Sequence, residues 1–194
     1  MKWKPWVWIL VGIVIGVPLL FALVGILAGF FFPAVSGARQ KAEHAHAEST
    51  AYHLKNAIAT FHTEYRDYPL TSPSGDFTTD SGHTLMDILL GAAPHKVPGG
   101  RNPRGIAFYA DKEAKPMAGG RFRKGITYHP ATGTGELWDP WGNLYRVRLD
   151  TDHNRRVENP EVPATSAFLP ETILVWSAGP DGDFDTWADN IKSW

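Results

Sequence analysis

A run of closely spaced aspartates near the carboxyl end is the chain's clearest candidate for chemistry. Its members are Asp181, Asp183, Asp185 and Asp189. Four carboxylates in one short loop repel one another, and a hard cation that takes about 6–8 oxygen ligands removes that repulsion and fixes the loop. Calcium suits this role better than magnesium, because magnesium demands near-octahedral geometry and keeps several waters. The pattern therefore predicts calcium as a cofactor bound by these four aspartates.

An alternative for the same loop is an acidic turn that binds no ion, in which Asp181 and Gly182 form the bend. We favour the metal site because Trp187, Ile191 and Trp194 follow it. These apolar side chains would anchor a chain terminus that otherwise has little reason to be ordered.

A second acidic loop comes directly after a strand expected at 144–149. Asp150, Asp152 and Asn154 place oxygen atoms at the first, third and fifth positions, as in the EF-hand calcium loop. Arg155, however, stands where that loop needs glycine, and its positive charge lies beside the proposed ion. We therefore favour a polar turn whose Asp and Asn side chains bond their own backbone. The three residues remain a second, weaker metal candidate.

No group of residues in the sequence predicts an enzyme. The histidines at 44, 46, 53 and 62 do not combine into a ligand set, and we interpret them as solvated positions of a helix. The histidines expected in loops have no serine or cysteine nearby in a nucleophile motif, and the paired glycines lack the lysine of a phosphate loop. We therefore expect a non-enzymatic protein.

The elements that position these loops begin with a long apolar segment. No charged residue occurs from Pro5 to Ala38, and about 20 apolar residues are enough to cross a bilayer. Tryptophans and lysines at its start suit the headgroup layer. The alternative is a cleaved signal peptide, whose apolar region is only about 7–15 residues long and is followed by a cleavage site of small residues, whereas Phe30-Phe-Phe-Pro33 stands here. We therefore predict a retained, single-pass membrane anchor over residues 1–38.

A helical apolar repeat follows the anchor. Its apolar residues recur at steps of four and three and so share one helix face. They are Ala47, Ala51, Leu54, Ile58, Phe61, Tyr65 and Tyr68. Pro69 ends the pattern, because the residue before a proline is displaced from the helical region. We predict that residues 39–68 form the soluble half of one long stalk helix.

Residues 69–194 are expected to form one globular domain. A short helix is expected at 85–90. Residues 144–149 alternate apolar and basic side chains, as in a half-buried strand, whereas 172–176 are continuously apolar, as in a strand covered on both faces. The predicted fold is α+β, in which a long N-terminal membrane-spanning helix packs its soluble half on a small antiparallel β-sheet.

The composition excludes some partners and some chemistry. The chain has 19 Lys and Arg against 20 Asp and Glu, a net charge of −1, and these charges are scattered. We therefore expect no nucleic-acid partner. Cysteine is absent, which excludes disulfides and thiolate catalysis.

Several of these pieces, in chain order, resemble one family. Residues 25–42 look like the second half of the N-terminal helix of a type IV pilin or pseudopilin. Residues 54–69 are similar to the end of that helix in the major pseudopilin of type II secretion systems. Residues 139–145, Asp-Pro-Trp-Gly-Asn-Leu-Tyr, resemble the family's Asp-Pro-Trp-Gly-x-x-Tyr signature, and residues 177–194 resemble its calcium-binding tail.

The resemblance implies a pilin-like fold and a structural subunit of a type II secretion or type IV pilus-like filament. Its partners would be copies of itself or other pilin-like subunits through the N-terminal helix, inner-membrane components of the secretion system, and membrane lipid. Its place would be the inner membrane, with the carboxyl-terminal domain in the periplasm or outside. By carry-over, Asp181 and Asp189 are the first calcium ligands, assisted by Asp183 or Asp185.

The N-terminus departs from the family. A processed pilin begins, after a glycine, with Phe-Thr-Leu-Ile-Glu, and that glutamate pairs with a neighbour's amino terminus. Residues 11–16 of this chain, Val-Gly-Ile-Val-Ile-Gly, offer neither the cleavage motif nor a carboxylate. Two hypotheses stay open: a filament subunit without this charge pair, and a permanently anchored extracytoplasmic binding module. In the second, Trp138, Trp141 and Trp187 are candidate ligand contacts, although we favour packing as their role.

Overall fold

The computed structural model describes residues 5–72, 75–161, 163 and 165–194; within the first helix it describes the side chains of 19, 20, 22 and 23 and those from 35 onward. Two compact units follow one another along the chain, Met1–Glu43 and His44–Trp194. We call the second the globular unit.

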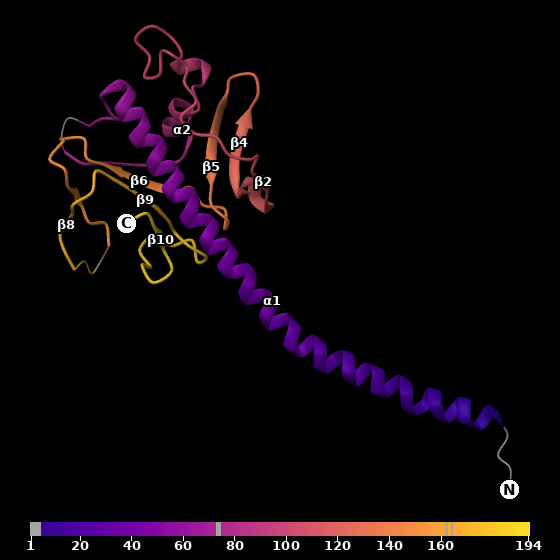
Figure 1. The fold of residues 1–194 in the computed structure, drawn as a ribbon. Helices are drawn as coiled ribbons and strands as arrows, with labels where there is room; N and C mark the ends of the chain where they lie inside the picture. Colours follow the sequence, from indigo (N-terminus) through magenta and orange to yellow (C-terminus); the bar gives the residue numbers. More distant parts are fainter. Residues whose placement is uncertain (1–4, 73–74, 162, 164) are drawn as a thin grey trace. The chain divides into compact units, whose positions relative to one another are not determined.

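Helix α1 (Pro5–Tyr65) is the longest element and contributes to both units (Figure 1). It confirms one long helix that continues into the globular unit. Arg66 ends it by adopting a left-handed backbone (φ 57°), and its N–H donates to the His62 carbonyl at 2.8 Å. Such a cap satisfies a carbonyl at the helix end that has no partner within the helix.

The predicted membrane anchor, residues 1–38, falls mostly on side chains outside the described residues. Among those that are described, the large apolar side chains of Leu19, Leu20, Leu23 and Val35 are exposed. Within the described part of the chain, no helix carries a long enough apolar stretch to cross a membrane. The membrane-spanning helix therefore stays a prediction.

A four-stranded antiparallel sheet organises the globular unit. Its strands lie in the order β1-β6-β9-β10. They are β1 (Phe77–Asp80), β6 (Arg146–Leu149), β9 (Ile173–Ser177) and β10 (Ile191–Lys192). The two central strands, β6 and β9, confirm the strands predicted at 144–149 and 172–176.

Smaller elements complete the unit. Three two-stranded antiparallel sheets pair β2 (Lys115–Pro116) with β3 (Phe122–Arg123), β4 (Gly125–His129) with β5 (Thr134–Trp138), and β7 (Val157–Glu158) with β8 (Phe168–Leu169). Helix α2 (His83–Leu89) confirms the short helix expected at 85–90, and the 3-10 turns are η1 (Ala93–His95) and η2 (Ala118–Gly120).

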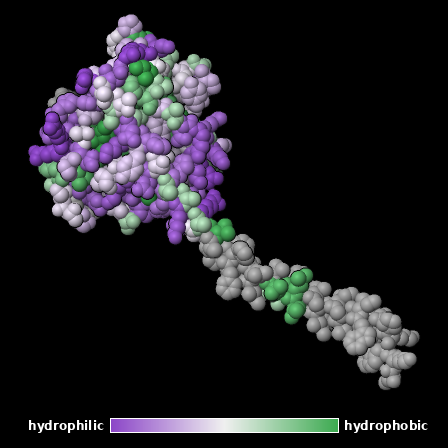
Figure 2. Space-filling view, in the orientation of Figure 1, coloured by the Kyte–Doolittle hydropathy of each residue, from purple (hydrophilic) through white to green (hydrophobic). Residues whose placement is uncertain are grey.

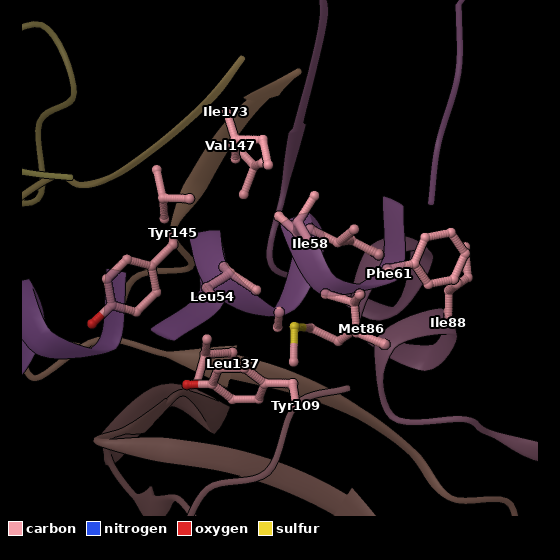
Figure 3. Packing of buried hydrophobic residues seen from close by; sticks show 14 of the residues in the cluster. Leu54, Ile58, Phe61, Met86, Ile88, Tyr109, Leu137, Tyr145, Val147 and Ile173 are labelled. Atoms are coloured by element: carbon pink, nitrogen blue, oxygen red, sulfur yellow. The ribbon is translucent and has the colours of Figure 1, made fainter. Parts of the chain in front are cut away.

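The main core forms between α1, α2 and the strands (Figure 3). Leu54, Ile58 and Phe61 of α1 meet Val147 of β6 and Ile173 of β9 there. Six of the seven apolar positions predicted from the helical repeat are buried, and Tyr65 is partly buried. Burying a side chain of this size contributes about 1.5–3 kcal/mol. The chain is thus α+β, with a helix packed on small antiparallel sheets.

Strand β9 is buried at all five positions, as its continuous apolar sequence predicts. Ile173 and Val175 belong to the main core, whereas Leu174 and Trp176 belong to a second cluster. The carboxyl-terminal aromatics Phe184, Trp187 and Trp194 pack against this second cluster. The two faces of β9 therefore have different covers, α1 with its core on one side and the chain's tail on the other.

The surface of the globular unit seen in Figure 2 is mostly hydrophilic, with apolar residues in small separate patches. Tyr52, Val97, Tyr128 and Phe168 are the large apolar side chains exposed among the described residues of this unit. Scattered exposure of this kind is ordinary for a folded domain.

Candidate metal centre

The Asp-Pro-Trp-Gly sequence forms a buried joint around Asp139. Its Oδ1 accepts the backbone N–H groups of Trp141, Gly142 and Asn143 at 2.8, 2.7 and 2.8 Å. Its Oδ2 accepts the Ser177 hydroxyl at 2.6 Å. Burial raises the pKa of Asp139 above its ordinary value, and these hydrogen bonds oppose that rise. The joint ties the turn between β5 and β6 to the end of β9, where the acidic tail begins.

The acidic tail folds back on itself as a closed loop, residues 179–190, which we call the tail loop. Gly179 has a left-handed backbone (φ 69°), and a Cβ there would lie 2.3 Å from the Asp189 carbonyl oxygen. The Asp181 N–H donates to Asp189 Oδ2 at 3.4 Å. The first and last of the four predicted ligands thus lie at the joined ends of the loop.

Between these ends the aspartates bond the loop's own backbone. The Asp183 N–H donates to Asp181 Oδ1 at 2.8 Å, and the Asp185 N–H donates to Asp183 Oδ1 at 2.9 Å. Such turns stabilise an acidic loop without an ion. In the described part of the chain, the tail carboxylates do not gather into a group of three within 4.8 Å of one another.

Two oxygens of the tail loop nevertheless lack a donor. Asp189 Oδ1 and Asn190 Oδ1 are buried, and no donor among the described residues reaches them. Asn190 is 8% exposed, and its Nδ2 donates to the Phe184 carbonyl at 2.9 Å. A buried acceptor left without a partner costs about 1–3 kcal/mol, and a bound cation would remove that cost. Sequence reasoning missed Asn190, whose position beside Asp189 was the available signal.

The aromatic anchors predicted for the tail are confirmed. The ring centroids of Trp187 and Trp194 lie 6.2 and 6.0 Å from that of Trp176. Ile191 pairs with Ser177 as β10 joins β9. The tail loop is therefore held on both sides, by the Asp139 joint before it and by the tryptophans and β10 around and after it.

The second acidic loop contributes to a carboxylate group that the sequence did not reveal in full. One carboxylate oxygen each from Asp76, Asp150 and Asp152 lie within 4.8 Å of one another, and this is the one such group of three in the described chain. Strand register explains the meeting: Phe77 of β1 pairs with Leu149 of β6, so their outer neighbours Asp76 and Asp150 fall side by side.

This triad combines a buried and an exposed carboxylate. Asp150 is 1% exposed and accepts the backbone N–H groups of Asn154 and Arg155 at 3.0 and 2.8 Å, whereas Asp152 is exposed. Burial and the bond to Asp152 raise the pKa of Asp150, and the same bond lowers the pKa of Asp152. Asp76 Oδ1 is buried without a donor among the described residues. A shared proton or a bound cation would satisfy these oxygens.

Asn154, the third predicted ligand of that loop, forms hydrogen bonds within the turn. Its Nδ2 donates to Asp152 Oδ2 at 2.8 Å, and its Oδ1 accepts the Arg156 N–H at 3.0 Å. The turn bonds expected for a polar loop are therefore present. Arg155 adopts the left-handed backbone (φ 63°) that glycine would take at this position of a calcium loop.

The remaining candidates contact other parts of the globular unit. Trp138, Trp141 and Trp187 are all partly buried, and Trp141 meets His44 edge to face at 5.4 Å. His46 lies between the Thr50 hydroxyl and the Lys112 ammonium, at 3.4 and 3.1 Å.

Comparison with known proteins adds no relative: no protein-family model, curated protein or solved structure matches this chain.

Proposed function

We propose that this chain is a non-enzymatic, pilin-like structural subunit, anchored in the inner membrane by α1 and carrying a calcium-stabilised extracytoplasmic domain. One observation carries the proposal. A single helix, α1, exposes large apolar side chains in its first half and buries an apolar face in its second half. Lipid or the helices of other subunits would cover Leu19, Leu20, Leu23 and Val35.

The Asp139 joint supports the same proposal. The residues that resemble the family signature are the ones that fasten the β5–β6 turn to the start of the tail loop. Asp139, Pro140, Gly142 and Tyr145 of this stretch are buried, which supports an architectural role for it in the proposed subunit.

Calcium would bind first at the tail loop, through Asp181 and Asp189 with help from Asp183 or Asp185. The unpartnered Asp189 and Asn190 oxygens support this position. The Asp76, Asp150 and Asp152 group is the second candidate, because its oxygens already lie within 4.8 Å of one another. Hard oxygen ligands at both places suit calcium.

A permanently anchored binding module is the second candidate function, and the missing glutamate in residues 11–16 favours it. The two candidates differ in whether α1 meets the α1 of another subunit. Partners of the filament subunit are copies of itself, other pilin-like chains and secretion-system membrane components; the binding module needs lipid alone to hold α1.

Cysteine crosslinking separates the two. The chain has no cysteine, so a single introduced one reports only its own surroundings. We expect Leu23→Cys, expressed in membranes and oxidised, to form disulfide-linked dimers on a non-reducing gel. The control, Thr63→Cys, is on an exposed position of α1 in the globular unit and should stay monomeric.

The opposite results are equally informative. If Leu19, Leu20, Leu23 and Val35 all fail to crosslink as cysteines while the protein remains in the membrane fraction, the filament subunit is excluded and the binding module remains. Recovery of the full chain in the fraction without membranes would contradict both candidates.

A further inference from the structure

A cavity of about 420 Å³ lies between the outer edge of β4 and the chain segment 107–113. We call it the β4 groove. All of its lining residues belong to the globular unit. Neither the tail loop nor the Asp150 loop contributes to it, so it is separate from both candidate calcium sites.

The groove exposes peptide groups of a strand edge. The described strand that pairs with β4 is β5, and Glu113 adds an isolated parallel bridge to Ile126. On its other side Ile126 is occupied, because its N–H donates to the Lys112 carbonyl at 3.0 Å and its carbonyl accepts the Ala114 N–H at 2.8 Å. In an antiparallel pair, alternate residues point their peptide groups outward. Two residues further along, Tyr128 therefore also directs its N–H and C=O away from β5.

The strand opposite supports this register. Gly135, the partner of Tyr128 in β5, donates its N–H to Asp87 Oδ1 at 2.9 Å and so points away from β4. Tyr128 and Gly135 thus form a pair without mutual hydrogen bonds. The N–H and C=O groups of Tyr128 therefore lie at the open edge beside the groove. An edge strand presents such unpaired groups to an added strand.

Side chains give the groove an apolar and aromatic wall. Leu90, Ala107 and Ile126 line it together with two tyrosines. Tyr109 is 5% exposed, whereas Tyr128 is 55% exposed and is one of the few large apolar side chains on the surface of this unit. An exposed tyrosine beside an open strand edge suits the side chain of an added strand.

The charge of the lining has one sign. Among the described residues, Asp111 and Glu113 line the groove, and no lysine, arginine or histidine does. The nearest cation along the chain, Lys112, places its ammonium 3.1 Å from His46 Nε2 instead. The Asp111 carboxylate accepts a long contact from the Tyr109 hydroxyl, at 3.4 Å, and the backbone N–H of Lys112 at 2.7 Å. This lining is complementary to a positively charged ligand.

We propose that the β4 groove binds an extended peptide that carries a lysine or arginine side chain, as a strand added beside β4. Its backbone pairs with the peptide groups of Tyr128, an apolar side chain fills the wall of Leu90, Ala107 and Ile126, and its cation meets Asp111 and Glu113. A small amine would use the two carboxylates but not the strand edge, so the open edge selects a peptide. This inference goes beyond the proposed function and is independent of calcium.

The test uses the full chain in detergent micelles and a fluorescein-labelled peptide, Val-Lys-Val-Lys-Val with blocked ends, followed by fluorescence anisotropy. We expect saturable binding that weakens about tenfold in the double variant D111N/E113Q, because both partners of the peptide cation are lost. Glu48→Gln, an exposed position on α1 outside the groove lining, serves as the matched control and should bind as the unmodified protein does.

Two further probes identify the binding mode. A peptide with the same side chains but N-methylated on alternate residues cannot pair with a strand edge, and it should lose binding. Lysine amide alone should not displace the labelled peptide. Binding that survives N-methylation, or displacement by lysine amide at similar concentration, would show that an amine and not a strand is recognised and would overturn the proposal.

A single variant tests the proposal even if D111N/E113Q does not fold. Glu113 is exposed, so Glu113→Gln alone should leave the fold intact. It should weaken the binding of the labelled peptide about threefold. Equal affinity in Glu113→Gln, in D111N/E113Q and in the unmodified protein, or no binding of the peptide to the unmodified protein, would contradict the proposal.

Discussion

Asp139→Ala lowers the free energy of unfolding by about 3–5 kcal/mol, measured by urea denaturation of residues 36–194. The side chain is fully buried and accepts three backbone N–H groups and the Ser177 hydroxyl. Alanine removes the acceptor of these donors, and the Gly142 N–H and the Ser177 hydroxyl among them are buried. The loss also frees the start of the tail loop, because Ser177 ends the strand from which that loop leaves.

Ser177→Ala is the graded control for this result. It removes the hydroxyl's bond to Asp139 and the bond that the hydroxyl accepts from the Gly179 N–H, and it keeps the three backbone bonds to Asp139. It should therefore lower the free energy of unfolding by only about 1–2 kcal/mol. If Asp139→Ala lowers the free energy of unfolding no more than Ser177→Ala does, then Asp139 does not organise the joint. The Asp-Pro-Trp-Gly element would then have no special role in stabilising the fold.

Phe61→Ala is expected to lower the free energy of unfolding of the same fragment by about 3–5 kcal/mol. Phe61 is 1% exposed and packs with Leu54 and Ile58 of α1 against the core that α2 and the strands complete (Figure 3). Its ring also meets Phe108 edge to face, with centroids 5.2 Å apart. Alanine leaves a cavity that the surrounding sheets and helices fill only in part.

Tyr52→Ala is the matched control for the helix, because Tyr52 lies on the same helix and is 41% exposed. Its effect should stay within about 0.5 kcal/mol. Equal effects of the two substitutions in urea denaturation would mean that the buried face of α1 does not hold the globular unit together.

The sequence predicts the parts of this fold whose patterns are long and periodic. The apolar steps of four and three identify the buried face of α1, and the continuous run at 172–176 identifies a strand covered on both faces. The aromatic residues after the aspartates correctly predict that the chain's end is packed. In each case the spacing of apolar residues within one short stretch of sequence predicts which side chains are buried.

What the sequence could not reveal depends on contacts between distant segments. Asp76 joins Asp150 only because Phe77 pairs with Leu149, and nothing local to either residue specifies that register. Asn102 is fully buried and accepts the Tyr65 hydroxyl at 2.7 Å while its Nδ2 donates to the Ile88 carbonyl at 2.7 Å. Before the fold is known, such an asparagine followed by proline reads as a surface turn.

The short paired strands form a third group. Strands such as β2, β3, β7 and β8 contain two residues each, too few to show an alternation of apolar and polar side chains. Their pairing follows from the turns and loops that bring them together.

Calcium binding is most directly tested by the thermal unfolding of residues 36–194 in excess calcium and in EGTA. We predict a higher midpoint in calcium; at a free concentration of about 100 times Kd the gain corresponds to roughly 2.7 kcal/mol. Asp181→Ala should remove most of this gain, whereas Asp152→Ala should leave most of it, because the tail loop is the first proposed site. Glu48→Gln should change nothing.

A gain lost in Asp152→Ala and kept in Asp181→Ala would move the ion to the group of Asp76, Asp150 and Asp152. The same midpoint in calcium and in EGTA would contradict the calcium-stabilised domain itself, and the tail loop would then be an acidic turn held by its own hydrogen bonds and by Trp176, Trp187 and Trp194.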